Sequence, residues 1–141
     1  MKRYFLLLLP AILILGSCST AEAEKVADEF HAKFDNNEID YIVDNMIDSH
    51  ATDEELEGFR NFLNGVRSNG KPSNREKATG FSKKMNNGLT TVKLNYTFDL
   101  EGEEVHEGLV LIDRGEGAGY KIMIISMSPD KDVVNQFTEG F

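Results

Sequence analysis

The stretch LTTVKLNYTFDL, residues 89–100, decides the fold of this chain. From Val92 to Leu100 every second residue is apolar, and the residues between them are polar. This period of two is typical of a strand that buries one face. Burial of the five apolar side chains contributes on the order of 8–15 kcal/mol before entropy, at about 1.5–3 kcal/mol each. The sequence therefore predicts a strand at 89–100 with Tyr96 and Phe98 on its buried face.

Three weaker strands are predicted around this one. Residues 75–85 precede it, and the turn Asn86-Asn87-Gly88 between the two strands favours a tight hairpin. Residues 105–113 and 120–127 follow, joined by the glycine-rich segment 114–119. Together these segments predict a four-stranded antiparallel meander.

The N-terminal half has a helical period instead. Apolar residues recur every three or four positions in residues 23–34, 39–47 and 56–66. Thr52 and Glu55 have the spacing of a capping box, which predicts the start of the third helix. Because helices come first and strands afterwards, we predict an α+β fold, with the helices packed on a curved meander in a single domain at 25–141.

This order of elements, with the alternation at 92–100 and the apolar run at 120–126, resembles the cystatin-like and nuclear-transport-factor-like α+β domains found in small bacterial lipoproteins. The resemblance covers about residues 22–128. It implies a sheet that wraps a long first helix. It carries no catalytic motif, so it implies no functional residue.

The N-terminal residues are typical of a secretory signal. Lys2 and Arg3 precede an apolar run at 4–15, which is shorter than the roughly 20 residues that a membrane-spanning helix needs. We therefore predict a signal peptide at 1–17 rather than a membrane span.

The segment LGSC at residues 15–18 resembles the lipobox of bacterial lipoproteins. The resemblance implies cleavage between Ser17 and Cys18, acylation of Cys18 and permanent anchoring to a membrane. Residues 18–24 would then form a lipidated tether. The expected location is the cell envelope, at the outer membrane if the organism is Gram-negative.

The charge of the chain excludes several classes of partner. The formal net charge is −9, and cleavage before Cys18 would remove two basic residues and bring it to −11. Such an acidic domain argues against nucleic acid and against a second, electrostatic attachment to anionic lipid. Cys18 is the only cysteine, so stability must come from the hydrophobic core rather than from intrachain disulfides.

No metal, cofactor or catalytic motif is predicted. The glycines at 115–119 lead into a predicted strand, whereas a phosphate loop leads into a helix. His31 has Asp28 and Asp35 at helical spacing but no second histidine, so we expect a solvated face there. The acidic cluster at 48–55 lacks the pattern of a calcium loop, and helix capping explains most of it.

The position of Glu107 depends on strand register. A loop of two or four residues after Leu100 would place Glu107 on the face of Tyr96 and Phe98, and a three-residue loop would leave it in water. If it faces inward beside Tyr96 or Tyr120, it is a candidate acid, base or ligand anchor, because burial raises the pKa of a carboxyl group. The alternative is an ordinary solvated acid at the rim of the sheet.

In the inward register of Glu107, the outer face of the sheet has an apolar patch. The residues of this candidate interface are Val110, Ile112, Met123, Ile125 and Met127. The patch is too large for casual exposure. Either the N-terminal helices or the tail at 133–137 covers it, or it binds a second copy or another envelope protein.

The leading functional hypothesis is a non-enzymatic, membrane-anchored binding domain whose ligand the sequence does not identify. The alternative is a small cavity-type hydrolase or isomerase that uses Glu107. A filled core around Glu107 would favour the first, and a deep cavity would favour the second.

Overall fold

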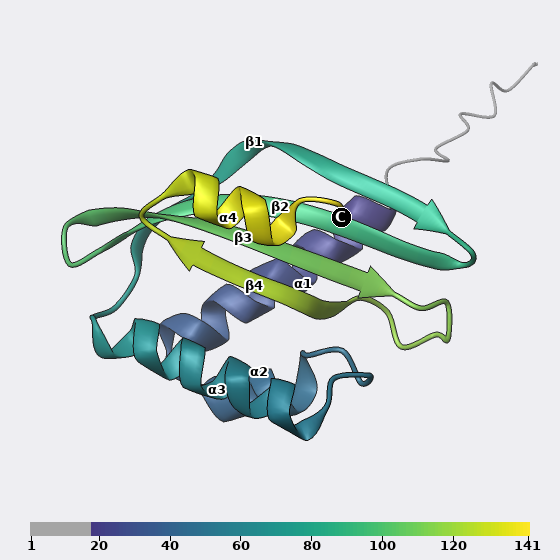
Figure 1. The fold of residues 1–141 in the computed structure, drawn as a ribbon, viewed down its shortest axis with the longest axis horizontal. Helices are drawn as coiled ribbons and strands as arrows, with labels where there is room; N and C mark the ends of the chain where they lie inside the picture. Colours follow the sequence, from purple (N-terminus) through teal and green to yellow (C-terminus); the bar gives the residue numbers. More distant parts are fainter. Residues whose placement is uncertain (1–17) are drawn as a thin grey trace, which may run out of the picture.

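The computed structural model describes residues 18–141, and Figure 1 shows its elements. In chain order they are α1 (Cys18–Asp35), α2 (Ile39–Asn45), α3 (Asp53–Ser68), β1 (Ser73–Asn86), β2 (Leu89–Leu100), β3 (Glu103–Asp113), β4 (Lys121–Ser128) and α4 (Lys131–Thr138). The four strands form one antiparallel sheet in the order β1-β2-β3-β4. The predicted α+β fold with N-terminal helices and a four-stranded meander is confirmed.

The predicted signal peptide and Ser17 lie outside the described residues, as does the side chain of Cys18. Residues 18–24, expected to form a tether, are instead the first turns of α1, and Ala23 is fully buried. Between residues 18 and 141, no helix is both long and apolar enough to cross a membrane.

The start of α3 has the capping box that the sequence predicts. The Thr52 hydroxyl accepts a hydrogen bond from the backbone N–H of Glu55, and the Glu55 carboxylate accepts one from the backbone N–H of Thr52 at 2.7 Å. These two bonds satisfy backbone donors that a helix start leaves unpaired.

Both tight hairpins have two-residue loops. Asn86 pairs with Leu89 across the first turn, and Leu100 pairs with Glu103 across the second. Residues 87, 88, 101 and 102 all have positive φ angles, which is the geometry of the type I′ turn that matches strand twist. The second turn fixes the register of β3 and directs Glu107 inward.

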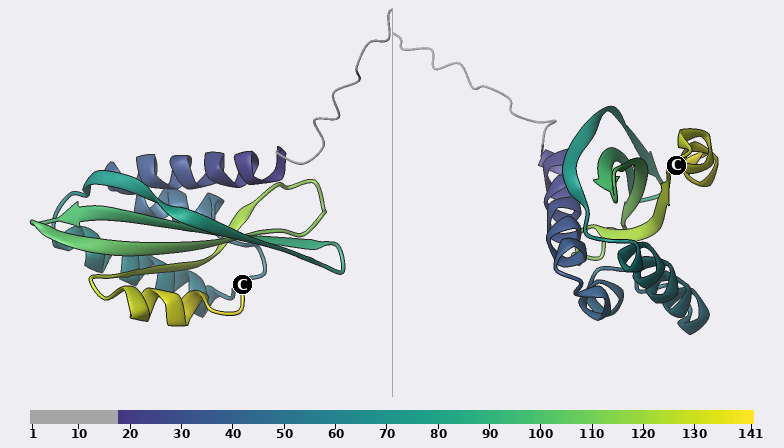
Figure 2. Two further views of the ribbon diagram at one scale, coloured as in Figure 1. Left: turned by 90° about the horizontal axis from the view of Figure 1, so that it is seen from above. Right: turned by 90° about the vertical axis from the view of Figure 1, so that its left-hand side faces the viewer.

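The sheet lies between two helical layers. Figure 2 shows α1 against one face and α4 against the opposite face, with α2 and α3 continuing the layer of α1. The main core lies between the sheet and the three N-terminal helices. Its largest fully buried side chains are Phe30, Phe34, Ile42, Leu63, Leu94, Leu109, Leu111 and Ile122.

The outer face of β3 is covered by α4. Val110 and Ile112 are both buried, and α4 contacts β3 and β4. Gly108 lies on the face of Val110, and a Cβ atom there would be 2.9 Å from Cγ1 of Val134. The helix therefore packs so closely on the sheet that position 108 accommodates only glycine without a shift.

For β4, the prediction of an outward apolar face is wrong. Ile125 pairs with Leu109 and Met127 pairs with Glu107, so both lie on the inner face, and Met123 borders a groove next to α3. A β-bulge in the β3–β4 pairing adds one residue to β4, and this shift reverses the faces that simple alternation predicts. The candidate interface is thus divided between the two sides of the sheet.

The free edge of β4 is partly occupied by the segment after α2. Ile47 forms a parallel bridge with Ile122. The backbone N–H of Asp48 donates to the carbonyl of Ile122, and the N–H of Ile122 donates to the carbonyl of Met46, both at 2.8 Å. These bonds attach the helical layer directly to the sheet.

Candidate functional site

Glu107 lies in the core between α1 and the sheet. It stands directly opposite Tyr96 in the β2–β3 ladder, and its side chain is completely buried. Nε2 of His31, on α1, lies 2.5 Å from Oε1 of Glu107. A buried hydrogen-bonded pair therefore connects the first helix to the third strand.

The prediction of a solvated His31 is wrong, because this residue is only 7% exposed. It follows Ala27 by four positions and precedes Phe34 by three, and both of these residues are fully buried. This spacing places His31 on the core-facing stripe of α1. The helical period therefore indicates burial of His31, whereas Asp28 and Asp35 at helical spacing favour a solvated face.

Tyr96 completes the cluster on the sheet side. Its ring meets the His31 ring edge-on, with centroids 4.5 Å apart and an interplanar angle of 81°. Burial, followed by the negative charge of Asp28, raises the pKa of the Tyr96 hydroxyl far above its ordinary value. Tyr96 therefore stays neutral across the physiological pH range.

Solvent does not reach the carboxylate of Glu107. Its Oε2 atom is buried without a hydrogen-bond partner in the described structure. Tyr96 and Glu107 also border a depression beside α4 of about 140 Å³, well below the roughly 300–1,000 Å³ of typical ligand pockets. An acid or base must lie within hydrogen-bond reach of the group it protonates, and this core leaves no room for a substrate.

Tyr120, the third residue of the candidate pocket, does not join this cluster. It is buried just before β4, where Lys121 pairs with Ile112. Glu107 pairs with Met127 near the other end of the same ladder. The structure thus brings together Tyr96 and Glu107, adds His31, and leaves Tyr120 apart.

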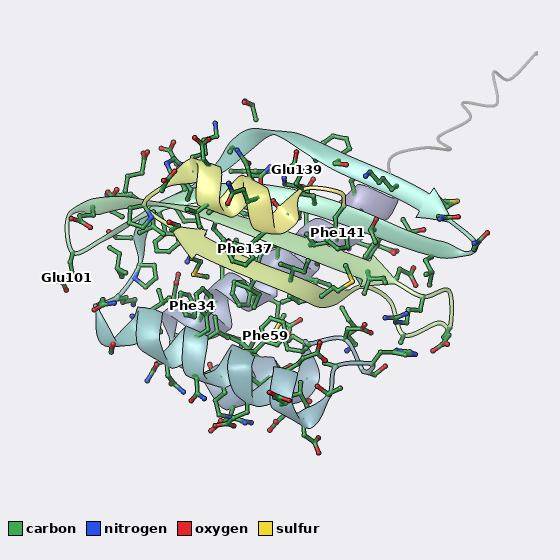
Figure 3. The ribbon with its side chains drawn as sticks, viewed as in Figure 1. Phe34, Phe59, Glu101, Phe137, Glu139 and Phe141 are labelled. Carbon is green, nitrogen blue, oxygen red and sulfur yellow. The ribbon has the colours of Figure 1, made fainter. Side chains whose placement is uncertain are left out.

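A groove of about 520 Å³ lies between α3 and β4. Its apolar walls come from Phe59 and Phe62 on α3 and from Met123 and Ile125 on β4. Figure 3 shows Phe59 between α3 and β4. The Cβ position of Gly58, at the border of the groove, has no neighbouring atom within 4 Å. An apolar groove of this volume with a few polar groups is the usual form of a small-molecule site.

One end of the groove is polar because Asp48 and Arg114 meet there. Arg114 Nε donates to Asp48 Oδ1 at 2.9 Å, and Nη2 donates to Oδ2 at 2.5 Å. The Arg114 guanidinium lowers the pKa of the Asp48 carboxyl, although burial opposes this effect. The sequence alone places Asp48 in the acidic cluster before α3, because its partner Arg114 lies 66 residues away.

The Asp48–Arg114 pair gives a pH-dependent prediction. At pH 7, Asp48→Asn is expected to lower the free energy of unfolding by about 1–2 kcal/mol, because charge-assisted hydrogen bonds are lost. The pKa of Asp48 is lower in the folded chain than in the unfolded chain, so its contribution is present above about pH 4 and disappears as the pH falls through the folded pKa. Urea unfolding of both proteins at pH 7 and pH 3 measures this difference. If the difference in free energy of unfolding between the wild type and Asp48→Asn is the same at both pH values, the stabilising role of the ionised Asp48 carboxylate is contradicted.

A second depression, of about 860 Å³, lies between the C-terminal end of α3 and the β2–β3 turn. Arg67, Asn69, Glu101 and Glu103 contribute much of its border, so it is more polar than the α3–β4 groove. No group of three or more histidine, cysteine, aspartate or glutamate side chains within residues 18–141 has the arrangement of a metal site.

Comparison with known proteins assigns no family to this chain. No protein-family model matches the chain, and no curated protein sequence shows significant similarity to it. The class that the structure defines is a small α+β domain with helices on a four-stranded antiparallel sheet.

Proposed function

We propose that this protein is a lipid-anchored binding domain of the bacterial cell envelope, held at a membrane by an acyl group on Cys18 and without enzymatic activity of its own. The lipobox-like segment at 15–18 supports the anchor. We further propose that the fold belongs among the cystatin-like and nuclear-transport-factor-like domains. A long first helix packed on an antiparallel meander supports this placement.

The observation that carries the non-enzymatic part of the proposal is the closed environment of Glu107. In a cavity-type hydrolase or isomerase, this carboxylate would line an open pocket. Instead, His31 occupies the position in front of it, 2.5 Å away, and the residue has no exposed surface. These contacts favour a structural role for Glu107.

The ligand site of the proposed binding domain is the α3–β4 groove. Its walls suit an apolar group, and the Asp48–Arg114 pair at one end offers polar contacts. Because Asp48 neutralises the guanidinium, the groove has no uncompensated cation for a strongly anionic ligand. The chemistry therefore points to a mainly apolar or amphipathic small molecule.

Groove binding can be tested with anilinonaphthalene sulfonate, a fluorescent probe with an apolar ring system and a single negative charge. Phe62→Glu is expected to abolish most of the probe's fluorescence increase, because it places a carboxylate in the apolar wall. Phe62 is 36% exposed, so the substitution leaves the core intact. Fluorescence titration of the full chain purified from membranes measures the difference.

The matched control is Phe137→Glu on α4, where the native side chain is 64% exposed and lies on the outer side of the sheet (Figure 3). This variant is expected to bind the probe like the wild type. Equal loss in both variants, or no loss in Phe62→Glu, would exclude the groove as the binding site.

A further inference from the structure

The start of α1 and the tip of the β1–β2 hairpin lie at the same end of the molecule. At the C-terminal end of α1, Asp35 pairs with Arg75 at 2.8 Å. Nearer the start of α1, Glu24 pairs with Lys77 at 2.6 Å. Strand β1 therefore runs opposite to α1 and continues from Lys77 toward the side where the helix begins, as Figure 2 shows.

The hairpin extends past the first residue of α1. Six residues of helix separate Cys18 from Glu24, a rise of about 9 Å. Eight residues of strand separate Lys77 from Met85, a length of about 27 Å. The left view of Figure 2 shows the hairpin tip projecting beyond the start of α1. A surface that held Cys18 and lay across the axis of α1 would therefore meet the hairpin as well.

This projecting hairpin exposes large apolar side chains. Met85 is 72% exposed, Phe81 is 59% exposed and Leu89 is 36% exposed. Within the described residues, Met85 has the largest exposed fraction of the large hydrophobic side chains. Scattered apolar residues are normal on a protein surface, but Met85 and Leu89 both lie beside the turn, whereas Phe81 lies farther back on β1, opposite Leu94. Two large exposed apolar side chains at one projecting tip indicate an interaction surface.

The hairpin also differs in charge from the rest of the chain. Between Glu76 and Asp99 the sequence has four lysines and no acidic residue, although the whole chain has a net charge of −9. Of these lysines, Lys77 is paired with Glu24 and Lys84 donates to the carbonyl of Gly140. The overall charge argues against attraction to anionic lipid, but this segment is a local exception. Lysines beside exposed apolar side chains are typical of segments that lie in a membrane interface.

We infer that the tip of the β1–β2 hairpin contacts the lipid bilayer, with Met85 and Leu89 at the boundary between headgroups and acyl chains. This inference rests on the proposed anchoring through Cys18. Ala23 is fully buried, so the proposed attachment point lies only five residues before the packed core. The hairpin then acts as a second contact that fixes the orientation of the domain on the membrane.

Tryptophan fluorescence tests the contact directly, because the chain contains no tryptophan. Met85→Trp would report from the hairpin tip, and Glu104→Trp would report from the opposite end of the sheet. Met85 pairs with Thr90 and Glu104 pairs with Asp99, so nine residues of β2 separate the two positions, about 30 Å. Glu104 is 65% exposed, so it accepts the larger side chain. Each full-chain variant is purified from membranes and placed in vesicles of phosphatidylcholine and phosphatidylglycerol, with and without brominated acyl chains.

Brominated lipid is expected to remove most of the fluorescence of Met85→Trp and to leave that of Glu104→Trp unchanged. Equal quenching of the two variants, or none, would overturn the inference. Mass spectrometry of the N-terminus in the same samples reports acylation separately. If the protein is acylated but Met85→Trp is not quenched, the hairpin contact is refuted and the anchor stands. If the protein carries no acyl group, the anchor is refuted, and the quenching of Met85→Trp still tests the hairpin contact.

Discussion

Replacing His31 with leucine is expected to lower the free energy of unfolding by about 3–5 kcal/mol, because it leaves the buried carboxylate of Glu107 without a partner. Glu107 has no exposed surface and its second oxygen already lacks a hydrogen bond. Water therefore cannot replace the lost contact. Urea unfolding at pH 7, followed by circular dichroism, measures the change.

The double variant His31→Leu, Glu107→Leu is the control for this prediction. It replaces the pair with two apolar side chains, and such replacements in cores are often neutral or stabilising. We expect it to recover most of the stability that the single substitution removes. If the double variant binds the fluorescent probe like the wild type, the pair has a structural rather than a binding role. A single variant as stable as the wild type would contradict the buried pair.

The proposed anchoring through Cys18 predicts that replacing this residue with alanine abolishes acylation and stable attachment to membranes. The reason is chemical, because the proposed lipid is attached to the thiol of Cys18 and the chain has no other cysteine. Anchoring by several acyl chains is strong because each buried methylene contributes about 0.8 kcal/mol. Fatty-acid labelling and membrane fractionation measure both effects.

The neighbouring substitution Ser19→Ala is the control for Cys18→Ala, because it leaves the thiol in place. It is expected to retain the acyl label and the membrane fraction. A Cys18→Ala protein that stays firmly in the membrane fraction without label would show that another feature holds it there. Retention in that case points first to the apolar segment at 4–15.

The secondary structure could be predicted where local patterns are strong. The alternation at 89–100 and the Thr52–Glu55 spacing each depend on side chains a few residues apart, and both are confirmed. The predicted residue range of β4 is close to the observed one, but the predicted outward direction of Ile125 and Met127 is wrong. A β-bulge adds a residue without changing composition, so the alternation gives no sign of it.

The candidate site was harder to predict because its contacts join distant residues. The register of Glu107 depended on one loop length, and the sequence left two-, three- and four-residue loops open. The structure has the two-residue loop, with Glu101 at φ 52° despite its side chain. His31 lies 76 residues from Glu107, so no local pattern could show that the two side chains pair.

The bridge between Ile47 and Ile122 also affects how neighbouring copies behave. The proposed lipid anchor would confine protein molecules to a plane, where unpaired sheet edges meet often and favour aggregation. Backbone bonds from residues 46–48 already occupy part of the edge of β4. On the other edge, register shifts and lysines interrupt β1. We therefore expect crowded molecules to remain separate rather than join their sheets edge to edge.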